Sequence, residues 1–428
     1  MHMKVVVIGA GTAGLAAASR LSREPGLEVT ILEAKDRIGG RIKTGHLQTN
    51  SVGLGASWMH ETRHNPLFQI GLKQGWSMRY TDLHPSFCTS RGEVPAGSGI
   101  GPILEDLNSI LVEKYQDEPV VADEEPSMAE FSYKEINSMP LITARQRELA
   151  RLAIREFEHF IAMPLGEFPV RDGAFPNVQG RDTYILGDGY QCVLDWLHSQ
   201  INWDRVSLHL ATPVTKVEES IVHTGTARFE ADYVLCTIPI GALKHDFDTI
   251  FPALPDLAGV RETVKATSAG KLGKIIIEFE SIFWNPDHDS FFVAHEVGDD
   301  IVTVINPSRS NMLMLLTGPP LTEKVESDPE NAIKHIYWAL QAIALPGKAV
   351  SKVNDYLVTN WTQDPYFRCS YSARSLGQSY DDLVAGYLYN ESNIRFAGEH
   401  TILEGNGCVH GAYESGLREA CIILKKNQ

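Results

Sequence analysis

The sequence predicts an α/β fold in which a parallel sheet is interleaved with a second, α+β region. Three features near the start of the chain predict the sheet. An apolar run at residues 4–8 is followed directly by a glycine-rich turn at 9–14, and a helix-forming segment begins at Leu15. A second apolar run at 29–32 ends in Glu33. This order of strand, turn, helix and strand is typical of the first unit of a Rossmann-like sheet.

The glycine turn predicts the kind of ligand. Gly9 permits the tight turn, Gly11 lets the backbone approach a pyrophosphate, and Gly14 lets the helix pack closely on the strand. The helix N-terminus, which includes Ala13, is expected to hold the phosphates. Glu33 stands where a second strand presents a carboxylate to ribose hydroxyls. We therefore expect a dinucleotide.

The segment after the second strand narrows the choice of dinucleotide. Arg37 and Arg41 flank a glycine pair that includes Gly40. Two guanidinium groups around such a pair suit a second backbone approach to phosphate, with charge-assisted hydrogen bonds. Nicotinamide enzymes do not need this element, so FAD is the expected cofactor.

Composition sets the broad class. A chain of 428 residues is long enough for two domains, and 43% hydrophobic with 21% charged residues is typical of a soluble globular protein. No apolar run approaches the roughly 18 residues that span a membrane, and the first run resembles a strand more than a signal peptide. The net charge of -16 argues against a nucleic-acid partner and favours encounter with cations.

The cysteines bear on the compartment. Six cysteines are scattered along the chain with no paired spacing typical of a zinc site or a disulfide framework. We therefore expect a cytoplasmic protein without a metal site, and a monomer or a homodimer.

The middle of the chain predicts a mixed region. Apolar residues at helical spacing predict one helix over 143–163, closed by Pro164, and another over 331–345. Residues 275–279 and 313–316 are expected to be strands. The stretch from 187 to 237, with strands at 206–210 and 233–236, resembles a return to the nucleotide-binding sheet, and Val214 within it is an expected cofactor contact.

The last third of the chain predicts a second cradle. A short strand from 393 leads to Gly398 and Glu399, a glycine-rich bend follows, and a helix is expected to open at Gly411. Glu399 is expected on ribityl or ribose hydroxyls. The amide of Val409, near the helix N-terminus, is expected to stabilise negative charge on a reduced flavin.

Together with the segment Gly53 to His60, these motifs resemble the FAD-dependent amine oxidases, and among them the polyamine oxidases of the spermine oxidase type. The segment at 272–274, before a strand, and the aromatic segment at 360–366 are similar to two further motifs of that family. The resemblance covers almost the whole chain. It adds four expected cofactor contacts: Gly55, Ala56, Ser57 and Trp58.

The resemblance implies a two-domain fold in which the chain crosses between domains several times. The FAD-binding domain is then formed by residues 1–75, 183–262 and 386–428. The α+β substrate-binding domain is formed by residues 76–182 and 263–385.

The resemblance also implies roles for single residues. Lys274 matches the lysine that holds a water at flavin N5, and we expect it to assist flavin reoxidation by oxygen. Trp361 matches the aromatic residue that lies against the flavin, and Tyr371 matches one wall of the substrate cage. His60 matches the histidine beside the substrate amines. Spacing alone would not select these residues, because aromatics are commonly core residues.

Departures from the pattern are informative. Monoamine oxidases have a flavin-bonding cysteine at the position of Ser370, so we expect noncovalent FAD even though Cys369 is adjacent. Their second cage wall falls at Cys408, which is not aromatic and which we count among the cofactor contacts. A more open tunnel is expected.

The expected reaction is oxidation of a polyamine, either spermine, spermidine or an acetylated derivative. Hydride moves to flavin N5, the imine is hydrolysed, and oxygen is reduced to hydrogen peroxide. An amino-acid oxidase, a flavin-dependent desaturase of another metabolite, and a nonenzymatic FAD-binding redox protein remain as alternatives. A histone demethylase is not expected, because no added helical arm or N-terminal module fits this length.

Overall fold

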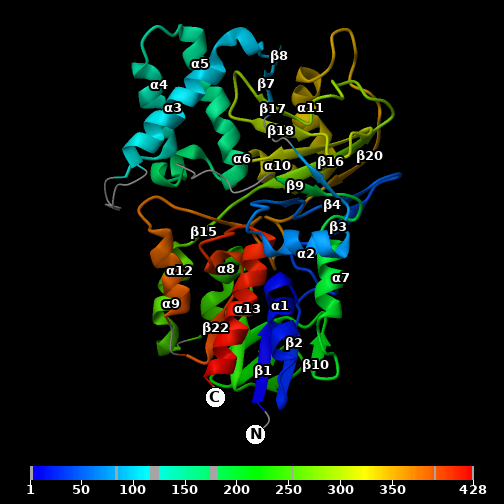
Figure 1. The fold of residues 1–428 in the computed structure, drawn as a ribbon, viewed down its shortest axis with the longest axis vertical. Coiled ribbons are helices and arrows are strands. Elements are labelled where there is room, and N and C mark those ends of the chain that lie inside the picture. The colour runs from blue at the N-terminus through cyan, green and yellow to red at the C-terminus, as the bar shows by residue number, and fades with distance from the viewer. Residues whose placement is uncertain are drawn as a thin grey trace.

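The computed structural model describes residues 3–81, 85–115, 125–173, 182–252, 254–389 and 392–426. Figure 1 shows two stacked regions. One is built around a five-stranded sheet and contains both ends of the chain, and the other is built around a seven-stranded sheet. Among the described helices, none is long and apolar enough to cross a membrane.

The five-stranded sheet is parallel, with the order β10-β2-β1-β14-β22. In that order its strands are Val206–His209, Leu27–Leu32, Met3–Ile8, Tyr233–Cys236 and Ile394–Phe396. The Rossmann-like sheet predicted from the sequence is confirmed. Because its strands come from three distant stretches of the chain, the loops at their carboxyl ends bring those stretches together.

Helices cover both faces of this sheet. The helices α1 (Thr12–Leu21), α13 (Val409–Lys425) and α7 (Gln191–Ser199) share one apolar core, and α8 (Ile240–Ile250) and α9 (Ala258–Ala266) share another. The first and last of these helices are in very close contact, since a Cβ on Gly416 would lie 2.1 Å from the carbonyl oxygen of Ala13. The N-termini of α1 and α13 are thereby fixed side by side.

The seven-stranded sheet has the order β20-β16-β19-β18-β17-β7-β8 and is antiparallel except for the β17–β7 pair. In that order its strands are Val353–Val358, Gly273–Phe279, Met312–Thr317, Ile301–Ile305, Ser290–Ala294, Ser86–Thr89 and Gly92–Glu93. Its apolar core is completed by α10 (Leu321–Ser327) and α11 (Ala332–Ala342). Strand β16 places Lys274 near the start of a fully buried strand.

A helical group lies beside this sheet: α3 (Ile100–Tyr115), α4 (Met128–Ser138), α5 (Ala144–Ala153) and α6 (Phe157–Ile161). The single helix predicted over 143–163 is wrong. A 3-10 turn at Ile154–Glu156 separates α5 from α6, and Ala162 ends α6 with a left-handed φ of 56°. Apolar periodicity does not report such a local tightening of the backbone.

The remaining elements are short. They are α2 (Pro66–Gln74), α12 (Tyr380–Leu388), β3 (Thr44–His46), β4 (Ser51–Gly53), β5 (Trp58–Met59), β6 (Met78–Tyr80), β9 (Thr183–Ile185), β11 (Val214–Glu218), β12 (Ile221–Thr224), β13 (Arg228–Glu230), β15 (Ser268–Ala269) and β21 (Ser372–Ala373). Figure 1 shows β3, β4, β9 and β15 between the two large sheets. The candidate site lies in this part of the molecule, between the two large sheets.

Candidate functional site

A cavity of about 1510 Å³ lies between the two regions. All three predicted catalytic residues line it, and so do all predicted cofactor contacts except Gly14 and Arg37. The lining residues among those predictions are Gly9, Gly11, Ala13, Glu33, Gly40, Arg41, Gly55, Ala56, Ser57, Trp58, His60, Val214, Lys274, Trp361, Tyr371, Gly398, Glu399, Cys408 and Val409. The fold thus brings residues from five separate motifs to one space.

The glycines of the first turn have different surroundings. Gly9 has a φ of 105°, and a Cβ on it would lie 2.5 Å from the hydroxyl oxygen of Thr237. A Cβ on Gly14 would lie 2.1 Å from the carbonyl oxygen of Gly9, so Gly14 serves helix packing. A Cβ on Gly11 would have no heavy atom nearer than the Cα of Gly40, at 3.9 Å. Only at Gly11 does the missing side chain leave room for a ligand.

The second glycine loop faces the first, and one of its arginines also holds the shape of the loop. Gly40 has a φ of 58° and approaches Gly11. The guanidinium of Arg37 donates hydrogen bonds to the carbonyl oxygens of Ile38, Gly40 and Ile42, at 2.8 to 3.0 Å. Three of its five N–H donors thus hold the loop in shape, and Arg37 is not among the residues that line the cavity, so its phosphate contact stays a prediction.

Glu33 closes the adenosine end of the cradle. Its side chain is 7% exposed, and its two oxygens accept hydrogen bonds from the amides of Ala10 at 2.7 Å and Lys35 at 2.9 Å. Burial raises the pKa of Glu33 despite these bonds. Because each carboxylate oxygen can accept a second bond, Glu33 can still receive a ribose hydroxyl, as predicted.

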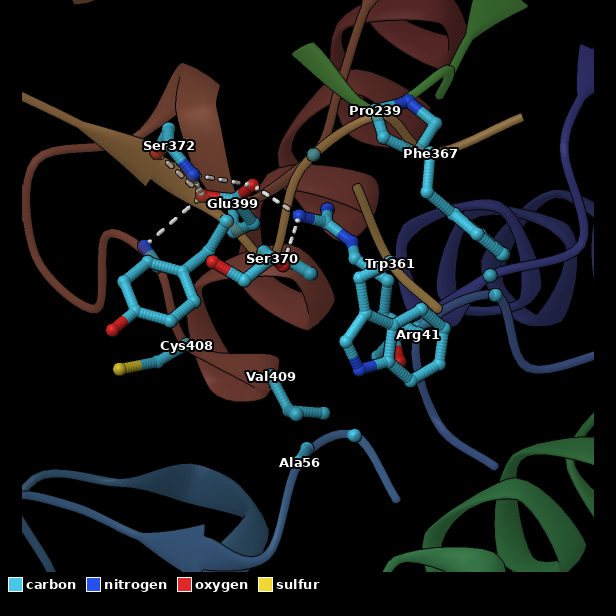
Figure 2. A pocket seen from close by; sticks show the side chains of 18 of the residues that line it. Arg41, Ala56, Pro239, Trp361, Phe367, Ser370, Ser372, Glu399, Cys408 and Val409 are labelled. Carbon is cyan, nitrogen blue, oxygen red and sulfur yellow. Dashed lines mark hydrogen bonds and ion pairs between the residues drawn. The ribbon is translucent and has the colours of Figure 1, made fainter. Parts of the chain in front are cut away.

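At the far end, an ion pair of 2.9 Å joins Arg41, whose side chain is 21% exposed, to the buried Glu399. Figure 2 shows the guanidinium between Glu399 and the main chain of Ser370, to whose carbonyl it also donates. Glu399 further accepts bonds from the amide and hydroxyl of Ser372 and from the amide of Gly407. Burial would raise the pKa of Glu399, but Arg41 and these bonds outweigh it and the pKa is lowered. Glu399 therefore carries a charge.

The start of the last helix borders the same space (Figure 2). Helix α13 begins at Val409, two positions before the predicted start at Gly411. Within the described chain, neither Gly11 at the start of α1 nor Cys408 at the start of α13 caps its helix with a side chain. Both helix starts therefore direct unpaired amides and positive dipole ends to the cavity, a setting that suits phosphate at one end and an electron-rich ring at the other.

Lys274 is buried at the cavity wall, with 7% of its surface exposed. Its Nζ donates to the carbonyl oxygen of Gly55 at 2.5 Å and to the hydroxyl oxygen of Ser57 at 2.7 Å, and it lies 5.4 Å from the ring centroid of Trp58. Burial lowers the pKa of Lys274 to about 7. Such a lysine exchanges a proton near neutral pH, which a solvated lysine does not.

Trp361 shares this part of the wall. It is 8% exposed, its ring lies 5.3 Å from that of Phe367, and a Cβ on Gly55 would lie 3.3 Å from its ring edge. Gly55 therefore lies between Trp361 and Lys274. In Figure 2 the indole borders the same open space as Val409.

Tyr371 forms another part of the cavity. Its hydroxyl donates to the carbonyl oxygens of Phe160 at 3.0 Å and His159 at 3.2 Å, at the end of α6. Burial raises its pKa strongly, so it stays neutral. Its ring packs on Gly407, where an added Cβ would lie 3.3 Å away. Tyr371 is thus held as a rigid wall.

His60 sits opposite, in an ion pair with Asp182 at 3.0 Å. Burial lowers the pKa of His60, but the bond to Asp182 outweighs it, and the net shift is upward. The ring centroid of His60 is 6.0 Å from that of Phe160, whose carbonyl holds Tyr371. The two predicted substrate contacts therefore face one chamber.

Sequence reasoning missed several residues of that chamber. The carboxylates that line the cavity include Glu61, Asp172, Asp182 and Glu404, and the phenylalanines include Phe157, Phe160 and Phe168. They come from loops and from the interrupted helix, where no motif marks them. Pairing and burial in the fold, not spacing, identify them.

The residues present fit a flavin dinucleotide that is not covalently bound. Ser370, which lines the cavity, stands where a covalent anchor would need a cysteine. Cys369 is fully buried, and burial raises the pKa of its thiol to about 11, so it is not a nucleophile at neutral pH. The cradle at Gly11 and Gly40, the acceptor Glu33 and the two helix starts suit the two halves of FAD.

Fold and site together define a dinucleotide-dependent oxidoreductase. Residues 143–424 match the family model of flavin containing amine oxidoreductases, and residues 7–70 match that of NAD(P)-binding Rossmann-like domains. The chain belongs to the flavin containing amine oxidoreductase family, and its cofactor is FAD.

Individual relatives carry different names. The chain is 29% identical to the Corticosteroid-binding protein of Candida albicans over 99% of this chain and 96% of that protein. It is 26% identical to Polyamine oxidase 5 of Oryza sativa subsp. japonica, covering 96% and 86%. It is also 26% identical to Lysine-specific histone demethylase 1 homolog 1 of Arabidopsis thaliana, where 98% of this chain spans 52% of the relative. These names state different ligands and substrates.

Proposed function

We propose that this protein oxidises a polyamine, either spermine, spermidine or an acetylated derivative, with dioxygen as electron acceptor. The observation that carries the proposal is a chamber in which carboxylates and His60 line the same cavity as Lys274. A polyamine is cationic at neutral pH, so carboxylates attract it. The net charge of -16 adds long-range attraction.

FAD, when bound, supplies the redox chemistry: it takes a hydride at N5 from the carbon beside a substrate nitrogen. Water then hydrolyses the substrate imine to an aldehyde and a shorter amine, and dioxygen receives the two electrons and two protons to give hydrogen peroxide. The chain's own part is to orient the amine and to manage protons. Lys274, with acceptors on the backbone of Gly55 and on Ser57, is the group we assign to the oxygen half-reaction.

The reacting nitrogen needs a free lone pair, yet aliphatic amines titrate near pH ~10. Asp182 and Glu61 favour the charged state of the remote nitrogens, and His60 between them is an acceptor or donor for a nitrogen nearer the reacting carbon. The rings of Phe160 and Tyr371 offer apolar surface to the methylene groups of the substrate.

The arginines of the cavity weigh against an amino-acid oxidase. Such an enzyme needs a guanidinium for the substrate carboxylate, and Arg171 and Arg374 do line the cavity. Arg374 is already paired with Asp172 at 2.6 Å, and Arg171 lies 3.6 Å from Glu125. A substrate carboxylate would compete with an acidic side chain of the protein for the arginine. The displaced carboxylate would then lose its ion-pair partner, which is unfavourable.

A second candidate is the binding of an apolar ligand such as a corticosteroid at the substrate end. The phenylalanine wall of Phe157, Phe160 and Phe168 favours it, and one relative bears the name Corticosteroid-binding protein. A steroid that binds in this chamber would compete with an amine. In a polyamine complex the same rings would contact the methylene groups of the substrate. Both candidate ligands would therefore use the same phenylalanine wall.

The test is anaerobic mixing of the FAD-loaded protein with separate compounds while the flavin absorbance is followed. The panel contains spermine, spermidine, their acetylated forms, an arylalkyl monoamine, amino acids and a methylated lysine peptide. Bleaching by polyamines, and peroxide release when oxygen is admitted, supports the proposal. Bleaching by amino acids or the peptide alone overturns it. An oxidised product with its C–N bond intact identifies a desaturase, and no bleaching by any compound favours the nonenzymatic alternative.

We further propose that the protein acts in the cytoplasm as a monomer or homodimer. The scattered cysteines support a reducing compartment, since Cys88, Cys236 and Cys369 are buried as free thiols. Light scattering of the eluted protein and fractionation of expressing cells test the two statements. A higher oligomer, or recovery in an organelle, contradicts them.

A further inference from the structure

Behind the cavity wall, one buried carboxylate holds the segment that leads into Trp361 and is linked to Lys274 through the hydroxyl of Thr359. Glu326 lies on α10 and is 5% exposed. It contacts the segment that follows β20, which leads into Trp361. A buried carboxylate is costly unless its oxygens are satisfied, so its partners show what it holds.

Glu326 accepts four hydrogen bonds from this segment. Its Oε1 accepts from the hydroxyl of Thr359 at 2.8 Å and from the amide of Trp361 at 3.0 Å. Its Oε2 accepts from the amide of Thr362 at 2.8 Å and from the hydroxyl of the same residue at 2.6 Å. The main chain on both sides of the Trp361 Cα is thereby fixed to one side chain.

The hydroxyl of Thr359 extends this hold to Lys274. This hydroxyl donates a hydrogen bond to Glu326 and accepts one from the amide of Lys274, at 2.8 Å. The amide of Thr359 donates in turn to the carbonyl oxygen of Lys274 at 3.0 Å. Glu326 therefore polarises a hydroxyl that anchors the Lys274 backbone.

At their other ends the two side chains meet again. The Nζ of Lys274 donates to the carbonyl oxygen of Gly55, and the indole edge of Trp361 lies 3.3 Å from the position of a Cβ on Gly55. A frame results, with Glu326 at the backbone end and Gly55 at the cavity end. Its rigidity determines where the amine and the indole lie relative to each other.

The chemistry of the frame requires a carboxylate. Each oxygen of Glu326 faces a backbone N–H, that of Trp361 or that of Thr362. A glutamine side chain has one oxygen and one NH₂ group, so either orientation places a donor against a donor. Glu326→Gln keeps the size of the side chain but breaks the frame at one point.

We propose that Glu326 is a positioning residue that sets Lys274 and Trp361 at their places beside the flavin. The roles of Lys274 and Trp361 rest on the proposed function, but the frame itself does not. Glu326 acts through these two residues and has no contact of its own with substrate in this assignment.

The experiment compares Glu326→Gln with Glu278→Gln, each loaded with FAD. Glu278 is a matched control because it is a 1% exposed carboxylate on β16, and the amide of Thr49 and the side chain of Asn50 both donate to the same one of its oxygens. A glutamine there keeps an acceptor for both. The flavin is reduced chemically with dithionite, and two readouts follow: the visible circular dichroism of the bound flavin, and the pH dependence of its reoxidation by oxygen.

We expect Glu326→Gln to change the flavin dichroism and to slow reoxidation by about 10-fold to 100-fold, as misplacement of a reacting group does. The pH midpoint of reoxidation shifts, and Glu278→Gln changes neither readout. Unchanged dichroism and rate in Glu326→Gln overturn the proposal. Equal changes in both variants also overturn it, because they report only loss of a buried charge.

A second variant keeps the test decisive if Glu326→Gln does not fold. Thr359→Val removes the hydroxyl that joins Glu326 to Lys274 and leaves the bonds to Trp361 and Thr362. Slower reoxidation is expected, with recovery in Thr359→Ser. Reoxidation of Thr359→Val at the unchanged rate contradicts the link from Glu326 to Lys274. Because dithionite replaces the amine, failure of the protein to oxidise any polyamine leaves these outcomes readable.

Discussion

The Nζ of Lys274 lies 2.7 Å from the hydroxyl oxygen of Ser57, a residue 217 positions earlier in the chain. This contact joins the seven-stranded sheet to the loop between β4 and β5. The partners that Nζ meets are neutral oxygens of Gly53, Gly55 and Ser57. With burial as the cause, the pKa of Lys274 falls to about 7, and both protonation states are present at neutral pH.

Replacing Lys274 with methionine is expected to slow flavin reoxidation by oxygen by roughly 10²-fold, at the lower end of what a positioned proton donor contributes. Methionine fills similar volume without the amine. The rate is measured by mixing reduced protein with oxygenated buffer in a stopped-flow instrument. Flavin reduction by the amine substrate serves as the control and should stay nearly constant. A normal oxygen rate would remove Lys274 from this role.

Two glycines of the first turn separate cofactor binding from folding. Gly11→Ala adds a Cβ with no heavy atom nearer than 3.9 Å, so we expect normal stability but weak FAD binding, because the methyl occupies the phosphate approach. Gly14→Ala places its Cβ 2.1 Å from the carbonyl oxygen of Gly9, so we expect loss of stability itself. Thermal unfolding of apo-protein and FAD titration distinguish them. Equal behaviour of the two variants would contradict the division.

The first sheet was predictable from sequence because its signals are local. A buried parallel strand such as β14 reads as a continuous apolar run, and Gly9, Gly11 and Gly14 mark the turn with fixed spacing. The cofactor end of the site follows from such motifs. Arg37 also has a part that its motif does not indicate, since three of its five N–H donors bond carbonyls of its own loop.

The substrate end could not be predicted in the same way. Asp182 and Glu61 line a chamber that several separate stretches of the chain enclose, and the sequence has no signal for that closure. Glu326 is similar, because its partners at Thr359 and Trp361 lie on another element. Family resemblance supplied His60, Tyr371 and Trp361: without it the two aromatics would count as core residues, and the histidine as structural or exposed.

The ion pair between Arg41 and Glu399 predicts a coupled loss of stability and cofactor. Arg41→Ala leaves the 5% exposed Glu399 side chain without its cation, which typically costs about 3–5 kcal/mol when one partner of a buried pair is removed. FAD affinity should fall too, because both residues line the cavity. Urea unfolding of apo-protein and FAD titration measure the two effects.

A double variant tests the same pair. Arg41→Ala with Glu399→Gln should be less destabilised than the sum of the single changes, since no buried charge is left alone. Additive losses would show that the two side chains act independently despite their 2.9 Å separation.

The pair of His60 and Asp182 predicts a pH dependence with a definite sign. Burial lowers the pKa of His60, but Asp182 and Glu61 raise it more, so the folded-state pKa exceeds the ordinary value. Protonation of His60 therefore stabilises the fold fully below the unfolded pKa of ~6.5, and this contribution is lost as pH rises through the folded pKa. Asp182→Asn removes the main raising cause, so its destabilisation should be larger near pH ~5.5 than near pH ~8.5, and the limb of kcat/KM that His60 controls should move to lower pH. Urea unfolding at both pH values and a kcat/KM profile provide the measurements.

Glu218→Gln is the control, because His223 and Glu218 form a histidine–carboxylate pair at 3.2 Å outside the cavity lining. That variant should leave the kcat/KM profile unchanged. A destabilisation by Asp182→Asn that grows with pH would reverse the assigned sign and remove His60 as the titrating group.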